Sequence, residues 1–244
     1  MVKEKRKMER GEIIEEPGLR NKTSVFEDRY HAGNLLAEKI KDYTGKDAFI
    51  LAIPAGGVPL AAVLSKRLNF PFDVLVVRKI HIPWSREAGF GAISWDGTIL
   101  FNESILDGLG LKREEIEGCV IEEKEEIEKR LKMFRGDKLS PDIQGKTAIV
   151  VDDGIASGFT MLVAISSLKQ KEPERIIVAV PTASMSAIQM IGNEADKIFC
   201  LNIREGRTFA VADAYKLWYD LENEEVVEIM KEAGYYGTGK VFLK

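Results

Sequence analysis

Cysteine and histidine are scarce in this chain, with two of each among 244 residues. Cys119 and Cys200 form no CxxC motif, so neither a disulfide framework nor a cysteine-based zinc site is expected. His31 and His81 belong to no HxxxH or HExxH motif, which excludes the common histidine metal sites. We interpret His31 as an ordinary packing or surface residue.

Long apolar runs and an excess of positive charge are also missing. No apolar run approaches the ~20 residues that span a bilayer, and residues 1–18 lack the apolar centre of a secretory signal. The formal net charge is −4 and no DNA-binding module is recognisable, so no nucleic-acid partner is expected. These absences favour a cytoplasmic protein that binds no membrane.

Apolar runs of strand length alternate along the chain with helical patterns. Most runs are continuously apolar, which is typical of parallel strands covered by helices on both faces. The expected strands are residues 48–53, 72–77, 91–95, 98–101, 147–151, 175–180 and 197–201. The expected helices are residues 34–43, 59–68, 160–169, 184–193 and 223–233. The pattern predicts an α/β fold with a doubly wound, mostly parallel sheet and a small antiparallel excursion at 91–101, where Asp96 and Gly97 favour a turn.

Composition divides the chain into three parts. Residues 1–22 read as a polar N-terminal arm, residues 23–235 as one domain, and residues 236–244 as a C-terminal tail. Within the domain, residues 112–135 are densely charged but carry one apolar stripe. This pattern predicts a helix that packs one face on its own domain, and a helix that binds a partner is the alternative.

One stretch, AIVVDDGIASGFTM at 148–161, carries most of the functional signal. Asp152 and Asp153 end a buried strand, and ligands of open parallel sheets bind beyond such ends. Small residues follow, and Thr160 opens the next expected helix, whose N-terminus favours an anion. Because carboxylates repel a phosphate, we expect them to face hydroxyl groups or a metal. A ribose 5-phosphate offers both a phosphate and a vicinal diol.

Other phosphate-binding motifs are absent. The chain contains no GxxxxGK[ST] motif, and no GxGxxG follows an expected strand. The GTGK sequence at 237–240 lacks an upstream strand and a following helix. The remaining alternative for residues 152–160 is an acidic turn that caps a helix.

Residues 147–161 resemble the signature of type I phosphoribosyltransferases that binds 5-phosphoribosyl 1-pyrophosphate (PRPP). The shared pattern is a buried strand, two acidic residues and a small-residue loop ending in Gly-x-Thr. ILAIPAGGVPLA, FDVLVVRKI and GAISW are similar to the uncharacterised prokaryotic "predicted phosphoribosyltransferase" branch of that superfamily, from about Phe26 onward.

The resemblance implies a role for each part of the signature. Asp152 and Asp153 would hold the 2- and 3-hydroxyls of the ribose, and they are the candidate protein ligands of a magnesium ion held mostly through the substrate. The turn Pro54, Ala55, Gly56 and Gly57 would bind pyrophosphate, since glycines let backbone N–H groups approach a polyanion. The loop that would hold the 5-phosphate is Gly154, Ile155, Ala156, Ser157, Gly158, Phe159 and Thr160.

Two further segments are candidates for the same site. Arg78 and Lys79, expected directly after the strand at 72–77, would neutralise the leaving pyrophosphate, and a solvated strand end is the alternative. Residues 81–91 occupy the place of a mobile loop that closes over the reacting centre and excludes water, with Arg86 and Glu87 as its candidate residues.

The implied reaction transfers the phosphoribosyl group of PRPP to a nitrogenous, nucleobase-like acceptor and releases pyrophosphate, with Mg²⁺ as cofactor and a homodimer as the assembly. Ala156 stands where 6-oxopurine enzymes carry an acidic residue, which disfavours a hypoxanthine or guanine acceptor. Aromatic residues within 208–221 would either stack on the acceptor or pack in the core. A regulator that keeps the fold to sense PRPP or nucleotides is the alternative function.

Overall fold

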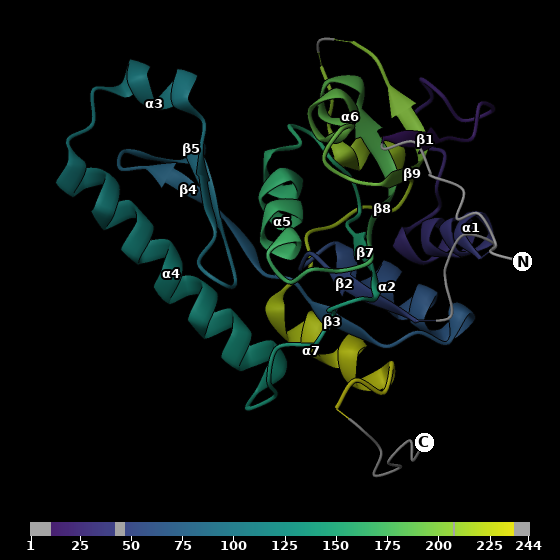
Figure 1. Cartoon of the computed structure of the whole chain (residues 1–244). Coiled ribbons are helices and arrows are strands. Elements are labelled where there is room, and N and C mark those ends of the chain that lie inside the picture. Colours follow the sequence, from purple (N-terminus) through teal and green to yellow (C-terminus); the bar gives the residue numbers. More distant parts are fainter. Residues whose placement is uncertain (1–10, 42–46, 207, 237–244) are drawn as a thin grey trace, which may run out of the picture.

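The computed structural model describes residues 11–41, 47–206 and 208–236 (Figure 1). Within these ranges, six strands form a fully parallel sheet in the order β1-β9-β8-β7-β2-β3. The strands are β1 (Glu12–Ile14), β2 (Ala48–Ala52), β3 (Phe72–Val74), β7 (Thr147–Val151), β8 (Arg175–Ser184) and β9 (Lys197–Arg204). The prediction of a doubly wound, parallel sheet is confirmed.

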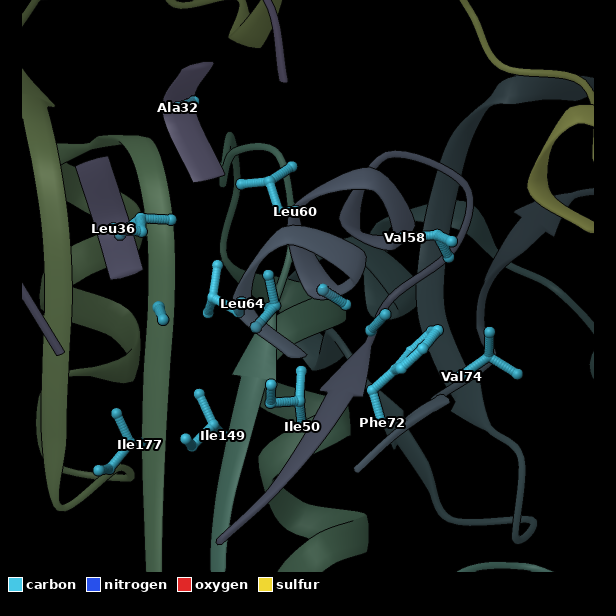
Figure 2. Close-up of a cluster of buried hydrophobic side chains, with 14 of the residues drawn as sticks. Ala32, Leu36, Ile50, Val58, Leu60, Leu64, Phe72, Val74, Ile149 and Ile177 are labelled. Atoms are coloured by element: carbon cyan, nitrogen blue, oxygen red, sulfur yellow. The ribbon is translucent and has the colours of Figure 1, made fainter. Parts of the chain in front are cut away.

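Helices cover both faces of this sheet. On one face lie α1 (Arg29–Ile40), α2 (Gly57–Leu68) and α7 (Asn223–Glu232), and on the other lie α5 (Phe159–Lys169) and α6 (Met185–Ile191). Figure 2 shows Leu60 and Leu64 of α2 beside Ile50 of β2 and Ile149 of β7. All four side chains are fully buried, which explains why the strand sequences are apolar without alternation.

A second, smaller sheet lies beyond α5, at the left of Figure 1. It is antiparallel and contains β4 (Val77–Ile82), β5 (Ser85–Ser94) and β6 (Ile99–Phe101). The predicted antiparallel excursion is therefore confirmed, but it begins earlier than expected. Residues 81–91, expected to be a long loop, form most of a β4–β5 hairpin instead.

The expected strand at 72–77 is likewise two strands. β3 ends at Val74 and β4 starts at Val77, so the chain passes from the large sheet to the small one between them. Arg78 and Lys79 consequently lie inside β4 rather than after a strand. The sequence does not show the boundary between the two strands, because Leu75 and Val76 are buried and are as apolar as the strands on either side.

After β6, α3 (Glu103–Leu109) leads to the long helix α4 (Arg113–Arg135). The apolar stripe of α4 packs inward through Ile127 and Phe134, which are buried. The structure therefore confirms a helix that packs one face on its own domain. No helix in the described ranges is long and apolar enough to cross a membrane.

Part of the expected N-terminal arm belongs to the large sheet. β1 pairs with β9, and the buried Lys197 ammonium lies 2.6 Å from the Glu12 carboxylate. Several segments with predictions lie outside the described residues. They are residues 1–10 of that arm, the end of the helix expected at 34–43, and residues 237–244 of the tail, which include the GTGK sequence.

Candidate functional site

The two carboxylates and the glycine turn meet at one edge of the large sheet. Asp152 and Asp153 follow β7 directly, and residues 54–57 follow its neighbour β2. A Cβ atom added to Gly56 would lie 1.9 Å from Asp153 Oδ2, and one added to Gly57 would lie 2.4 Å from the Val151 carbonyl oxygen. Only glycine fits at either position, so the two loops touch through backbone that carries no side chain.

The loop after the carboxylates is anchored to β8 by its first half. The Ile155 N–H donates to the Thr182 carbonyl oxygen at 3.0 Å, and Ser184 Oγ donates to the Ala156 carbonyl oxygen at 2.6 Å. A Cβ atom on Gly154 would lie 2.9 Å from Thr182 Cγ2. This side of the loop is therefore fixed by close packing.

The second half of the loop presents backbone donors. Helix α5 begins at Phe159, after Gly158 with a φ of 85° in the left-handed region. Among the described residues, none accepts a hydrogen bond from the backbone N–H of Ala156, Ser157, Gly158, Thr160 or Met161. A cluster of unpartnered N–H groups at a helix start is suited to an anion.

Asp153 forms a buried ion pair that the sequence did not indicate. Arg29 Nε, from the first turn of α1, donates to Asp153 Oδ2 at 2.8 Å, and the two residues are 6% and 9% exposed. The Arg29 guanidinium also donates to the Tyr219 carbonyl oxygen at 2.9 Å and stacks 4.0 Å from the Trp218 ring centroid. The Tyr215 hydroxyl donates to the Asp153 carbonyl oxygen at 2.6 Å.

The two carboxylates resist ionising together. Burial and the Asp153 charge raise the pKa of Asp152 well above its usual value. Burial also raises the pKa of Asp153, and the Arg29 charge opposes this rise. Asp152 Oδ1 accepts a hydrogen bond from the Asp153 backbone N–H at 2.8 Å. A cation or a hydroxyl donor at Asp152 would relieve this electrostatic conflict.

Arg78 lies in a different cluster, between the small sheet and α4. Its Nε donates to Glu123 Oε2 at 2.9 Å, and His81 Nδ1 lies 2.7 Å from Glu123 Oε1. Arg86 Nη2 lies 3.3 Å from Glu122 Oε1 on the same helix. These side chains line a cavity of about 310 Å³ together with Lys129 and Arg130. The cavity lining includes neither carboxylate of the β7 pair.

Lys79 and Glu87, the other charged residues expected to act, belong to the same hairpin. Lys79 follows Arg78 in β4 and is exposed, while Glu87 lies in β5. Because side chains alternate along a strand, Lys79 and Arg78 point to opposite faces of the small sheet. The structure thus brings together the carboxylates, the loop at 154–160 and the turn at 54–57, while the charged residues of the hairpin belong to the small sheet.

The aromatic residues near the C-terminus mostly pack. Tyr215 is buried against Phe26, with ring centroids 5.5 Å apart, and Trp218 lies 5.1 Å from Tyr215. Phe209 lies 5.1 Å from the Arg204 guanidinium. They contribute to the site indirectly. The Tyr215 hydroxyl donates to the Asp153 carbonyl oxygen, and the Trp218 ring stacks on the Arg29 guanidinium.

Comparisons with known proteins place the chain in a family. The family described as "Phosphoribosyl transferase domain" matches residues 28–217. Two Mycobacterium tuberculosis proteins, "Putative phosphoribosyl transferase Rv0571c" and "Putative phosphoribosyl transferase MT0597", are each 32% identical over 209 residues. The alignments cover 86% of this chain and 47% of each relative, so the chain spans about half the length of the curated relatives it matches.

A solved structure has a similar fold. The protein TT1426 from Thermus thermophilus, whose crystal structure has been solved, is 30% identical in sequence to this chain. The two structures align with a TM-score of 0.71 over 85% of this chain and 98% of that one. The family match includes both carboxylates, the loop at 154–160 and the turn at 54–57. The chain therefore belongs to the phosphoribosyl transferase domain family, with the type I fold.

Proposed function

We propose that this chain binds PRPP with Mg²⁺ and transfers its phosphoribosyl group to a nitrogenous, nucleobase-like acceptor, with release of pyrophosphate. One observation supports this proposal above all. A carboxylate pair, a set of unpartnered backbone N–H groups and a glycine turn meet at the carboxyl ends of β7 and β2. These groups match the diol, the 5-phosphate and the pyrophosphate of one ligand.

In this proposal the backbone donors at 156–161 bind the 5-phosphate, with the Ser157 and Thr160 hydroxyls nearby. The pyrophosphate lies against the turn at 54–57, where the backbone N–H groups of Ala55 and Gly56 have no acceptor among the described residues, while those of Gly57 and Val58 donate to the carbonyl oxygens of Ile53 and Ala55. Asp152 accepts hydrogen bonds from the ribose hydroxyls.

The chain would act by orientation and charge rather than by a nucleophile of its own. As the bond from C1 to pyrophosphate breaks, C1 gains positive character and the acceptor nitrogen attacks from the opposite side. Fixed N–H groups hold both ends of the ligand so that C1 faces the acceptor, and a rigid site supplies this orientation before the reaction begins.

The residues fit a magnesium ion held mainly by the substrate. Mg²⁺ prefers hard oxygen ligands and often takes one or two carboxylates plus substrate phosphates. Asp152 supplies such an oxygen, whereas the described residues contain no group of three or more carboxylate, histidine or cysteine side chains suited to a metal. When bound, the ion would neutralise charge on the departing pyrophosphate.

The hairpin β4–β5 is proposed as the closing element. In the structure the Arg78 guanidinium is engaged by Glu123. For Arg78 to meet a pyrophosphate it has to leave this carboxylate, and we propose that this exchange accompanies closure of the hairpin with Lys79, Arg86 and Glu87. With the acceptor already bound, this closure would enclose the site and exclude water.

Thermal unfolding with PRPP and magnesium tests the proposal. Ligand at ~100 times its dissociation constant adds about 2.7 kcal/mol to the free energy of unfolding, or roughly 5–10 °C in the midpoint for a chain of this size. Ribose 5-phosphate is the control, since it lacks the pyrophosphate. A magnesium-dependent rise, followed by pyrophosphate release on screening acceptors, is expected. No rise in the midpoint at millimolar PRPP contradicts the proposal. If PRPP binds but no acceptor is turned over, the alternative function is favoured, a regulator that senses PRPP or nucleotides.

We also propose that the chain forms a homodimer, as the family resemblance implies. Light scattering at micromolar protein gives the mass directly. A mass near twice the monomer's 27.3 kDa is expected, and a monomer contradicts the proposal.

A further inference from the structure

Arg78 lies close to the proposed pyrophosphate turn along the chain. The Leu75 N–H donates to the Ala52 carbonyl oxygen at 2.7 Å, so the chain leaves the large sheet directly beside residues 54–57. Arg78 follows three residues later, at most roughly 11 Å away along an extended chain. Ile80 lies on the same face of β4 as Arg78 and packs in one buried cluster with residues of α2, the helix that follows the turn. Arg78 therefore lies on the side of the small sheet that looks toward the turn.

In the structure, Glu123 of α4 holds the Arg78 guanidinium instead. The Glu123 side chain is 7% exposed, and Ile127, one turn further along α4, is buried as well. Glu123 Oε2 accepts from Arg78 Nε at 2.9 Å, while Oε1 lies 2.7 Å from His81 Nδ1. Because a buried carboxylate needs such partners, Arg78 leaves Glu123 only for an anion that binds the guanidinium more tightly.

Two neighbours of Glu123 lower the cost of losing Arg78. His81 keeps one carboxylate oxygen paired. Arg130 lines the same cavity of about 310 Å³, and its buried Nε lies 3.5 Å from Glu126 Oε1 but forms no hydrogen bond within the described residues. Burial and the Arg78 charge both lower the pKa of Arg130, so the two guanidinium groups repel each other. Once Arg78 leaves, this repulsion ends and Arg130 has room to approach Glu123.

We propose that Glu123 is a positioning residue of the pyrophosphate site: it keeps Arg78 away from the empty turn at 54–57 and releases it only when a pyrophosphate group is bound there. This inference rests on the proposed PRPP site and assigns to it a residue that contacts no ligand. Closure of the hairpin then depends on the pyrophosphate group, because ribose 5-phosphate offers Arg78 no anion at C1 in exchange for Glu123.

The same competition acts on the substrate and on the product. PRPP and free pyrophosphate both have to win Arg78 from Glu123, so the carboxylate weakens the binding of each by the same factor. After transfer, Glu123 can take Arg78 back, which helps the pyrophosphate to leave. Ribose 5-phosphate binds without this competition, and its affinity does not depend on Glu123.

Calorimetric titration in the presence of Mg²⁺ tests the inference, with PRPP, pyrophosphate and ribose 5-phosphate as ligands of the wild type and of Glu123→Gln. Glutamine keeps the shape of the side chain but removes the charge that holds Arg78. We expect Glu123→Gln to bind PRPP and pyrophosphate roughly tenfold more tightly than the wild type does, with an unchanged affinity for ribose 5-phosphate. A merely structural role of Glu123 would weaken the binding of all three ligands or of none.

Two further variants show whether Glu123 acts through Arg78. Arg78→Gln should bind PRPP and pyrophosphate at least roughly tenfold more weakly, and Glu123→Gln added to it should give no tightening. Glu125→Gln is the matched control, since it removes the same charge from the same cavity wall. Glu125 is exposed and pairs with no cation among the described residues, so its loss should change the affinity for PRPP by less than about twofold.

The outcomes separate the inference from the proposed function. A wild type that binds no PRPP overturns both. If the wild type binds PRPP and Glu123→Gln binds it no more tightly, the positioning role alone is overturned. The same holds if the tightening extends to ribose 5-phosphate, appears equally in Glu125→Gln or persists beside Arg78→Gln. If Glu123→Gln does not fold, Glu123→Asp replaces it. Its carboxylate is one methylene further from Arg78, so it should bind PRPP a few-fold more tightly, and an unchanged affinity overturns the inference.

Discussion

Two buried arginine–aspartate pairs in this protein are built alike. Arg29 lies 2.8 Å from Asp153 and 4.0 Å from the Trp218 ring centroid, while Arg135 lies 2.9 Å from Asp73 and 4.0 Å from that of Trp95. Both arginines also donate to a backbone carbonyl oxygen. Each pair links a helix to a residue in or directly after a strand of the parallel sheet, so each fixes a helix against the sheet.

The pairs differ in what lies beside the aspartate. Asp73 Oδ1 also accepts from the Tyr235 hydroxyl at 2.8 Å and from the Val74 N–H at 2.6 Å. Asp153 instead adjoins a second carboxylate, Asp152, whose pKa is raised well above its usual value. The carboxylate of the Arg135–Asp73 pair accepts from several donors, which suits a role in stabilising the fold, whereas a second carboxylate beside the Arg29–Asp153 pair suits the proposed ligand site.

The largest effect on stability should come from breaking the Arg135–Asp73 pair. Arg135→Met leaves Asp73 buried without its cation, which should lower the free energy of unfolding by roughly 3–5 kcal/mol. Urea unfolding measures this loss, with the exposed Arg113→Met on the same helix as a control expected within about 0.5 kcal/mol of the wild type. A loss below about 1 kcal/mol would show that the Arg135–Asp73 pair contributes little to stability.

The next effect concerns Asp152. Asp152→Asn should weaken PRPP binding at least a hundredfold, about 2.7 kcal/mol, because the ligand hydroxyls lose their anion. The ligand-free protein should not be destabilised, since the substitution removes a charge that burial and Asp153 already oppose. Calorimetric titration measures the PRPP affinity, and urea unfolding measures the stability of the ligand-free protein. A variant that binds PRPP as tightly as the wild type would contradict the proposed role of Asp152.

A smaller effect should follow from filling the contact between the two loops. Gly56→Ala places a methyl group on the Asp153 carboxylate, so we expect a loss of roughly 1–3 kcal/mol of stability together with weaker PRPP binding. Gly118→Ala in α4 is the control, since its Cβ meets no atom within 4 Å and should stabilise the helix by about 0.5–1 kcal/mol. Equal effects at both glycines would refute the close contact.

The smallest effect is in the pH dependence of the ligand-free protein. Because the folded pKa of Asp152 lies above its usual 3.8, the folded state binds this proton more tightly than the unfolded state. Stability from this group is therefore present below the unfolded pKa and is lost as pH rises through the folded pKa. The wild type should lose stability relative to Asp152→Asn by less than about 1.4 kcal/mol per pH unit over that window. Parallel curves would refute the raised pKa.

Most of the parallel sheet was predictable from sequence, because a strand buried on both faces has to be apolar throughout. The carboxylates and the loop at 154–160 were predictable for a related reason, since polar and small residues directly after such a strand have few structural explanations. The partner of Asp153 was not predictable. Arg29 is a single cation 124 positions away, and no local pattern distinguishes it from other helix residues.

The hairpin β4–β5 was missed because its glycines resemble loop residues. A Cβ atom on Gly89 would lie 2.4 Å from Lys79 Cγ, and one on Gly91 would lie 2.8 Å from the Leu100 carbonyl oxygen. These glycines are required by close neighbours across the small sheet rather than by a turn. Sequence alone does not distinguish the two requirements.

The stacking of Arg29 on Trp218 gives the site a built-in optical reporter. Indole emission responds to a nearby charge and to the polarity around the ring, and this ring touches the arginine that holds Asp153. Of the other two tryptophans, Trp84 lies 64% exposed at the hairpin turn and Trp95 stacks on Arg135. In a variant with phenylalanine at those two positions, indole emission would come from the proposed ligand site alone, so that ligand binding could be followed in real time without a label.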